Sequence, residues 1–317
     1  MLKNKSFKFI FKLAVSIALI WFLLKSVDLS EIQNSLIDVN LMMLTLAGVL
    51  FFGHQILVAW CWQILLAAQG NRVPFMRVLQ VHFIGNFIGV FMPTSIGMDV
   101  VRAYSLAKYM KNGVDSASSM FVSRVVGYLV FFAMAISMAV PLVQKTGEPL
   151  FFLLVVFTAV CFILGVWLLL SKKMLNALQP LCSRFNLEKI VGKLREFQAS
   201  ILAFRRQRNA MLNLLFWTIV YQVLGIYIPY LIGLSLGIEI SFIYYFVTIP
   251  VIMAITILPI SIGGIGVREW SFKALFVPLG ATGGQAVSLS ILFMLLGIMI
   301  ALFGGIVYLF SGSRGKR

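Results

Sequence analysis

The chain has 317 residues, of which 61% are hydrophobic and only 11% are charged. Soluble domains contain roughly half apolar and about a quarter charged residues, so this composition excludes a soluble monomer. A mean hydropathy of +1.00 indicates that lipid solvates much of the surface and that the chain crosses a membrane several times. The net charge is +16, from 26 basic and 10 acidic residues. In a membrane protein this excess is first a topology signal, and we expect no nucleic-acid partner.

Six stretches are long and apolar enough to cross a bilayer, which takes about 20 helical residues. They are residues 9–24, 41–68, 116–143, 150–171, 211–234 and 286–311. The first stretch follows Lys3, Lys5 and Lys8, as the apolar part of a signal peptide would, but it has no small-residue cleavage site. We therefore interpret it as an uncleaved first span.

Two further apolar stretches, residues 78–110 and 242–279, are interrupted in the middle by proline and glycine, which end helices. Each half is too short to cross a bilayer at about 1.5 Å per residue. We predict that both stretches are re-entrant helical hairpins, which enter and leave the membrane on the same side. Two short tilted spans per stretch are the competing interpretation, and they give the same side for every loop.

The distribution of basic residues predicts the orientation in the membrane. A cytoplasmic amino terminus puts most of the 26 basic residues inside, including the tail 312–317, and only Lys25, Lys145 and Lys273 outside. We predict a multi-pass protein of the cell membrane with both termini in the cytoplasm. In the basic segment 172–209, apolar residues recur every three or four positions, which predicts a surface-lying amphipathic helix. A loop that only fixes the topology is the alternative.

The two interruptions contain the same pattern, PxSIGxxxVR, at residues 93–102 and 259–268. Six of the ten positions are identical, which indicates an internal duplication. We predict an all-α integral membrane protein of two repeats, residues 1–143 and 150–311, each with three transmembrane helices and one re-entrant hairpin. Three crossings per repeat invert the second copy. Inverted repeats with broken helices are typical of secondary transporters with a site near the midplane.

The broken helices also predict a cavity, because backbone polar groups freed inside a bilayer are tolerated only beside protein or water. Half-helices that begin near Met98 and Ile265 would point their amino-terminal dipoles into this cavity, which favours an anion. Small and hydroxyl residues of the breaks are candidate ligands. They are Ser95, Gly97, Ser261, Gly263, Gly264 and Gly266. Tight hairpin tips without a ligand are the alternative.

Five embedded charges lie beside these breaks or within a span, and each costs about 2.5–3.5 kcal/mol at the centre of an inserted helix. They are Asp99, Arg102, Arg124, Arg268 and Glu269. Their charges sum to +1, so we predict that the arginines bind one phosphate-like anion, whose shape a guanidinium fork suits. The two acids would position the arginines or carry a coupling proton. A salt-bridge network that only locks the hairpins is the alternative.

The expected partners of these charges follow from their spacing. Asp99 and Arg102 are three residues apart and can pair on one helix face. Glu269 is expected to meet Arg102 or Arg124 from across the repeat, because adjacent side chains diverge by about 100° around a helix. Arg124 could alternatively snorkel to the cytoplasmic interface.

The remaining polar residues give no sign of catalysis or metal binding. His54 and His82 lack partners at metal-binding spacing and are interpreted as hydrogen-bonded polar residues. Asn86 and Tyr104 flank the first break and either line the cavity or pack. The three cysteines are an odd number and are interpreted as packing residues. We find no nucleophile, phosphate-loop or zinc-protease motif, so we expect neither an enzyme nor a cofactor.

The segments PTSIGMDVVRAY, SRVVG around Arg124 and PISIGGIGVRE resemble the signature regions of a flippase-like transmembrane family. The family is named after the membrane domain of lysylphosphatidylglycerol synthase, and the resemblance covers essentially the whole chain. It implies an integral membrane protein that binds or moves lipid, which is an aminoacylated phospholipid in the two-domain synthase. Other relatives are associated with lipid-linked sugars. Six residues follow Ser311, so we expect no attached transferase domain and no synthase activity.

These features predict a lipid flippase or transporter that binds an anionic phospholipid or a lipid-linked headgroup between the two hairpins. The expected partners are anionic membrane lipids, with a lipid-modifying enzyme or a glycosyltransferase as further candidates. The alternative is a membrane-embedded enzyme or accessory protein of aminoacyl-phospholipid or lipid-linked glycan synthesis, with an embedded acid as its base.

Overall fold

The structure is a computed structural model. It describes residue 21 and residues 29–92, 95–146, 149–171, 188–257, 261 and 263–312. Over these residues the chain forms helices and turns, without a strand. The predicted first span, residues 9–24, lies outside the described residues except for Trp21, and so do residues 172–187 and 313–317.

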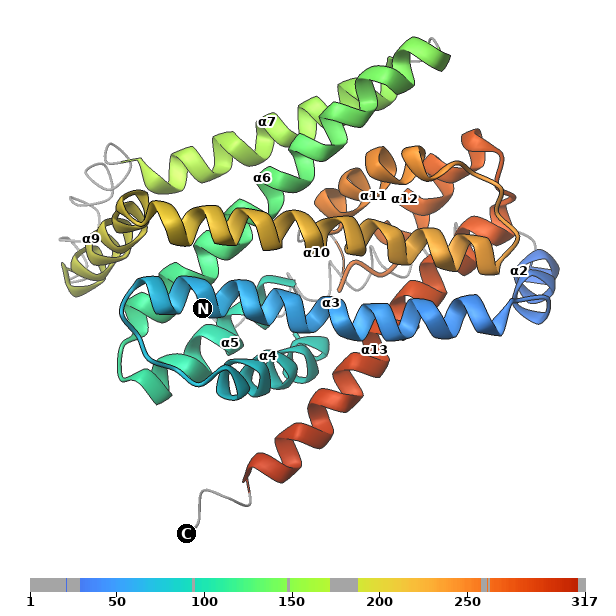
Figure 1. Cartoon of the computed structure of the whole chain (residues 1–317). Coiled ribbons are helices and arrows are strands. Elements are labelled where there is room, and N and C mark those ends of the chain that lie inside the picture. The colour runs from blue at the N-terminus through green and yellow to red at the C-terminus, as the bar shows by residue number, and fades with distance from the viewer. Residues whose placement is uncertain are drawn as a thin grey trace.

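The described helices follow the predicted order. They are α2 (Leu29–Ile37), α3 (Leu41–Ala68), α4 (Phe75–Val90), α5 (Ser95–Met110), α6 (Gly113–Thr146), α7 (Leu150–Leu170), α9 (Glu188–Ala203), the 3-10 turn η1 (Phe204–Arg206), α10 (Arg208–Ser235), α11 (Phe242–Ile257), α12 (Val267–Phe276), the 3-10 turn η2 (Val277–Leu279) and α13 (Gly283–Gly312) (Figure 1). Five of them, α3, α6, α7, α10 and α13, are long and apolar enough to cross a membrane. The all-helical fold is confirmed over the described residues, and five of the predicted spans coincide with these candidate membrane helices.

Both predicted interruptions are real breaks between short helices. The first separates α4 from α5, and the second separates α11 from α12. The helices α4, α5 and α11 have 16 residues each and α12 has 10, which corresponds to about 24 Å and about 15 Å. Each is too short to cross a bilayer alone. The two helices on either side of each break pack against each other.

The second break turns through three glycines with positive φ, at Gly263 (60°), Gly264 (79°) and Gly266 (86°). Glycine adopts such angles without the strain that a Cβ atom adds. A Cβ on Gly264 would also overlap the side chain of Thr256 on α11. Glu269 caps the start of α12, because its side chain accepts a hydrogen bond from the N–H of Gly266 (N to Oε2, 2.7 Å).

The most extensive helix pair is α3 with α10, and it joins the two halves of the chain. The pair is antiparallel, because the N–H of Asn40 before α3 donates to the carbonyl of Ser235 at the end of α10 (2.8 Å). Helix α4 packs on α13, and α11 packs on α6. The first and second halves of the chain therefore interlock and do not form separate bodies (Figure 1).

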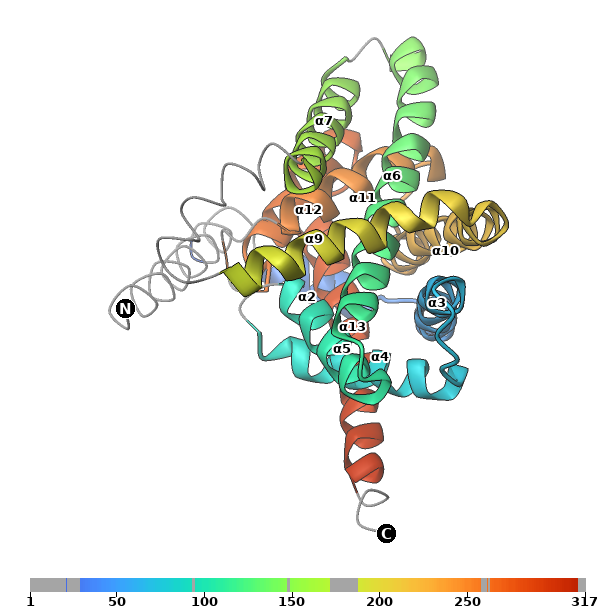
Figure 2. The same cartoon turned by 90° about the vertical axis from the view of Figure 1, so that its left-hand side faces the viewer.

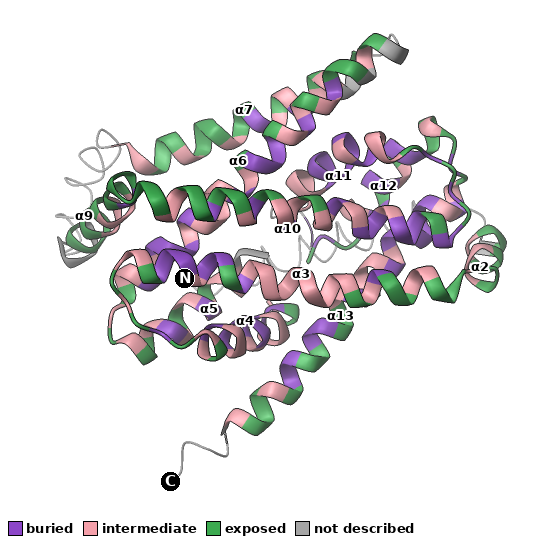
Figure 3. Ribbon diagram, in the orientation of Figure 1, coloured by how far each residue is buried: buried purple, intermediate pink, exposed green. Residues whose placement is uncertain are grey.

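The main core lies among α6, α10, α11, α12 and α13, where Tyr245, Phe272 and Phe276 are fully buried. The outer faces of α7, α10 and α13 expose large apolar side chains, as lipid-facing surfaces do (Figure 3). These exposed faces agree with a protein that is surrounded by hydrocarbon.

The basic segment after α7 contains a helix, but not one continuous helix. Helix α9 lies across one end of the bundle and packs on α6 (Figure 2). Its Phe197 ring meets Phe121 of α6 at 5.6 Å between centroids. The helix ends at Ala203, directly before Phe204, the last apolar residue of the recurring pattern, which is buried in the η1 turn.

Candidate functional site

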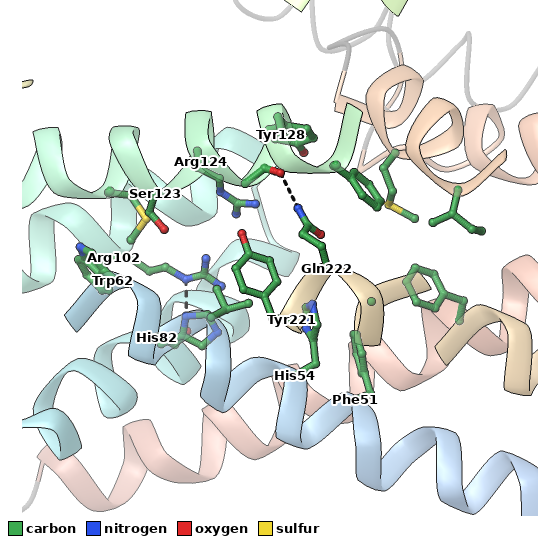
Figure 4. Close-up of a pocket in the computed structure, with 18 residues that line it drawn as sticks. Phe51, His54, Trp62, His82, Arg102, Ser123, Arg124, Tyr128, Tyr221 and Gln222 are labelled. Atoms are coloured by element: carbon green, nitrogen blue, oxygen red, sulfur yellow. Dashed lines mark hydrogen bonds between the residues drawn. The ribbon is translucent and has the colours of Figure 1, made fainter. Parts of the chain in front are cut away.

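A cavity of about 190 Å³ lies halfway along the central helices α3 and α10 (Figure 4). Each of these helices has 28 residues, and His54 is the fourteenth residue of α3, while Tyr221 is the fourteenth of α10. In helices that cross a bilayer, this place corresponds to the middle of the membrane. The cavity therefore lies near the middle of both helices.

The walls of the cavity carry positive charge. Its 18 lining residues come from α3, α4, α5, α6, α10, α11 and α13, and none of them is acidic. The polar ones are His54, His82, Arg102, Ser123, Arg124, Tyr128, Tyr221 and Gln222. Two guanidinium groups beside a small cavity without a carboxylate in its walls are suited to an anion.

Asp99 bridges these two arginines from just outside the cavity. Its Oδ1 lies 3.0 Å from Nη1 of Arg102, one turn along α5. Arg124 of α6 binds the same carboxylate through both oxygens, with Nε to Oδ2 at 2.6 Å and Nη2 to Oδ1 at 2.8 Å. The Arg102 side chain is only 4% exposed, whereas that of Arg124 is 42% exposed. Arg102 is thus fixed in protein, and Arg124 presents an accessible surface.

Helix α4 holds Arg102 in place. The Arg102 Nη2 group donates to Asn86 Oδ1, and its Nε donates to the carbonyl of His82 (3.4 Å). A Cβ on Gly85 would overlap the Arg102 side chain, so α5 approaches α4 this closely only because residue 85 is glycine. Gln55 of α3 completes the network through His82 Nε2 (2.9 Å).

An apolar groove of about 560 Å³ meets the cavity at Arg124. The groove runs among α5, α6, α7 and α9, and its walls are mainly aliphatic and aromatic. It shares Met120, Arg124 and Tyr128 with the cavity, and Asp99 lines it as well. The Asp99–Arg124 pair therefore stands at the boundary between a positively charged cavity and a groove that suits a hydrocarbon chain.

The second break has a different arrangement of charges. Arg268 pairs with its neighbour Glu269 (Nη2 to Oε1, 2.6 Å), and Ser290 of α13 donates to the same oxygen (3.2 Å). Their side chains are only 12% and 9% exposed, and they line neither the cavity nor the groove. The expectation that Glu269 meets Arg102 or Arg124 is wrong. Glu269 is the third residue of α12, and its carboxylate accepts a hydrogen bond from the N–H of Gly266 at the start of the helix. The Arg268 side chain turns to the same end of the helix and donates to this carboxylate.

The small residues of the breaks that the structure describes do not line the cavity. Gly97 lies in the first turns of α5 against Met92, and Gly263 and Gly264 form the turn before α12. Ser261 is buried, and its hydroxyl has no hydrogen-bond partner among the described residues. The side chain of Ser95 lies outside the described residues. The structure thus brings together Asp99, Arg102 and Arg124, and leaves the second-break residues apart from them.

Sequence reasoning missed Tyr221 and Gln222 as lining residues. The sequence does contain a signal for such residues, namely a polar glutamine in the middle of an apolar helix. Gln55 and Gln222 are each the fifteenth residue of a 28-residue helix. Gln222 donates to the carbonyl of Gly127 on α6 (2.7 Å). The His54 ring faces Tyr221 edge-on at 5.6 Å, and its Nδ1 has no partner among the described residues, which differs from the hydrogen-bonded role expected for it.

The polar residues that flank the first break have different surroundings. Asn86 binds Arg102, whereas Tyr104 is exposed and lines neither the cavity nor the apolar groove. Arg124 turns toward Asp99 and does not snorkel away from it. Among the residues that the structure describes, no group of three or more His, Cys, Asp or Glu side chains could hold a metal ion.

The fold and the site define a polytopic helical membrane protein with a charged cavity near its centre. The family model described as the lysylphosphatidylglycerol synthase TM region matches residues 9–305, and the chain belongs to this family. It is also similar to the UPF0104 membrane protein PH1989 of Pyrococcus horikoshii, at 26% identity over 296 residues, which cover 83% of this chain and 86% of that protein. No solved structure matches the chain. The resemblance found in the motifs is confirmed, and membership by itself shows no catalytic activity.

Proposed function

We propose that the protein moves an anionic lipid across the membrane. The lipid phosphate binds in the cavity at Arg124 and Arg102, and its hydrocarbon chain lies in the apolar groove. The main support is that Arg124 lines both spaces. A molecule that fills both has an anionic head joined to a long apolar chain, which is the general form of a phospholipid or a polyprenyl phosphate.

The charge of the cavity narrows the class of lipid. None of the lining residues is acidic, and both oxygens of the nearby Asp99 are bound to arginine. The ammonium group of an aminoacylated headgroup would lie beside two guanidinium groups, and the one nearby carboxylate, Asp99, stays paired with Arg102 when phosphate binds Arg124, which is unfavourable for a further cation. We therefore favour an unmodified anionic phospholipid or a polyprenyl phosphate as the cargo over an aminoacylated lipid.

The Asp99 carboxylate occupies the place at Arg124 that we assign to the cargo phosphate. It occupies the Arg124 fork through two hydrogen bonds, and a phosphate presents the same two-oxygen edge. A phosphate that arrives through the groove replaces Asp99 at Arg124, while Asp99 remains paired with Arg102. The group of two arginines and one aspartate carries +1, so a singly charged phosphate neutralises it.

The helix packing supports an inverted repeat, and the short helices beside each break support two re-entrant hairpins. The distribution of basic residues supports cytoplasmic termini. If α3, α4, α5 and α6 correspond to α10, α11, α12 and α13, each described pairing among them has a counterpart. The α4–α13 pair corresponds to α11–α6, the α5–α6 pair to α12–α13, and α3–α10 to itself. Inverted repeats exchange conformations during alternating access. We therefore propose a second state in which the cavity opens toward the opposite leaflet.

Reconstitution in liposomes tests this function. Labelled phosphatidylglycerol and phosphatidylcholine are compared for transfer between leaflets, with wild type, Arg124→Gln and Arg206→Gln. Arg206 is a control because it is exposed and lines none of the described pockets. We expect wild type and Arg206→Gln to move phosphatidylglycerol faster than phosphatidylcholine, and Arg124→Gln to lose this preference. Equal rates for both lipids in the wild type would contradict the proposal.

A further inference from the structure

A second apolar groove, of about 530 Å³, lies on the outside of the bundle between α6 and α10. Its walls are Val126, Leu129 and Val130 of α6 and Met211, Leu212 and Leu215 of α10, and it also includes Arg205 and Arg208. It shares no residue with the central cavity or with the first groove. We call it the outer groove. It is a separate feature and is not an extension of the candidate transport site.

The turn between α9 and α10 fixes the two arginines at the outer groove. Phe204 begins this turn and is only 3% exposed, packed in a core cluster with Leu214 and Tyr221. Arg205 follows Phe204 directly, and Arg208 is the first residue of α10. Because the buried Phe204 holds the backbone of this turn in place, the backbone positions of Arg205 and Arg208 are also fixed.

Both arginines are available to a ligand. Arg205 and Arg208 are exposed, and neither forms an ion pair with any residue that the structure describes. None of the groove residues is acidic. The first turn of α10 also has no acidic residue, and the residue that precedes it, Gln207, provides no side-chain cap. The positive end of the α10 dipole therefore adds to the attraction of the arginines for an anion.

The rest of the outer groove suits a hydrocarbon chain. Leu129, Leu212 and Leu215 are exposed, and they face outward from two membrane-spanning helices. Leu215 lies two helical turns beyond Arg208, or about 10 Å along α10. A pair of basic side chains at the end of an apolar groove is an arrangement by which membrane proteins bind the headgroup and one acyl chain of an anionic lipid.

We propose that the outer groove is a second binding site for an anionic phospholipid, separate from the transport path. Arg205 and Arg208 bind the lipid phosphate, and one acyl chain lies between α6 and α10. The lipid comes from the leaflet that contains the α9–α10 turn, which the positive-inside rule assigns to the cytoplasm. Since α6 carries Arg124 and α10 carries Tyr221, a lipid in this groove supports the two helices that shape the central cavity.

Native mass spectrometry of the purified full-length chain tests this site. The protein is titrated with phosphatidylglycerol, phosphatidylcholine or glycerol phosphate. The variants are wild type, the double variant Arg205→Gln/Arg208→Gln, and Arg206→Gln as a matched control between the two arginines. We expect wild type and the control to retain phosphatidylglycerol in two steps. In the double variant, one of these two binding steps should be at least tenfold weaker than in the wild type.

Three results would overturn the proposal. The double variant could bind phosphatidylglycerol as the wild type does, phosphatidylcholine could bind equally well, or the control could lose the same step. Binding of glycerol phosphate with the affinity of the lipid would show a site for a free anion and not for a lipid. The central site is tested independently, because Arg124→Gln should remove the other binding step and leave this one intact.

Discussion

The two helix breaks share six of ten residues, yet their arginines have different surroundings. In the first break, Arg102 shares Asp99 with Arg124 of α6, and both arginines line the central cavity. In the second break, Arg268 is paired with Glu269 and Ser290, and the pair lines neither the cavity nor the first groove. The same motif thus places its arginine at the wall of a cavity in one half and in a local ion pair in the other.

The position of the acid explains this difference. The first break has its acid inside the motif, at Asp99, three residues before the arginine, where it can also reach α6. The second break has Ile265 at that position and Glu269 directly after the arginine. Glu269 caps its own helix and keeps Arg268 there. The shift of one acid therefore replaces the arrangement of two arginines around Asp99 with a local contact between neighbours.

Removal of the accessible arginine is expected to have the largest effect. Arg124→Gln loses the charged fork at the boundary of cavity and groove, and a charge-assisted hydrogen bond contributes about 1.5–3 kcal/mol. We expect anionic-lipid binding to Arg124→Gln to weaken by about 10- to 150-fold. Arg124→Lys should have an affinity between those of wild type and Arg124→Gln, because an ammonium group keeps the charge but lacks the two-pronged geometry of guanidinium. Binding to the purified protein measures this. The account fails if Arg124→Gln binds phosphatidylglycerol as wild type does.

The second prediction has the opposite sign. Asp99→Asn removes the carboxylate that competes with phosphate at Arg124 but keeps an acceptor for Arg102. We expect anionic-lipid affinity to rise about tenfold, equivalent to about 1.4 kcal/mol, while the lipid-free protein becomes less heat-stable. Titration and thermal unfolding with and without lipid measure both quantities. Weaker lipid binding in this variant would show that Asp99 only positions the arginines.

The third prediction concerns the closed pair in the second break. Glu269→Gln leaves Arg268 without its charged partner in a buried place, so it should cost about 1–3 kcal/mol of stability. Because this pair lines neither the cavity nor the first groove, anionic-lipid affinity should stay within about twofold of wild type. Thermal unfolding and lipid titration are compared with those of Asp99→Asn. A large loss of affinity in folded Glu269→Gln protein would place the second break in the binding site.

At the glycines of the second break, an effect on stability alone is expected. Gly263→Ala and Gly264→Ala both place a Cβ at positive φ, which costs about 1–2 kcal/mol. Only the Cβ at residue 264 also meets Thr256, whereas the space beside residue 263 is open. Gly264→Ala should therefore lower the unfolding temperature more than Gly263→Ala does. Equal effects would mean that the close approach to α11 adds nothing.

Much of the fold was accessible from the sequence, because long apolar stretches and helix breakers have direct causes in bilayer thickness and backbone chemistry. The pairing of Asp99 with Arg102 followed from their spacing. The Asp99–Arg124 contact was not predicted, since it depends on how α5 packs on α6. Gly85 was overlooked for the same reason, as its role is visible only beside Arg102.

The most direct test of the central claim is an experimental structure of the protein in phosphatidylglycerol nanodiscs. The account predicts phosphate density within hydrogen-bond distance, about 3 Å, of the Arg124 guanidinium group, with Asp99 turned toward Arg102 and chain density in the groove among α5, α6, α7 and α9. Phosphate density confined to the outer surface, with Asp99 still bound to Arg124, would contradict it.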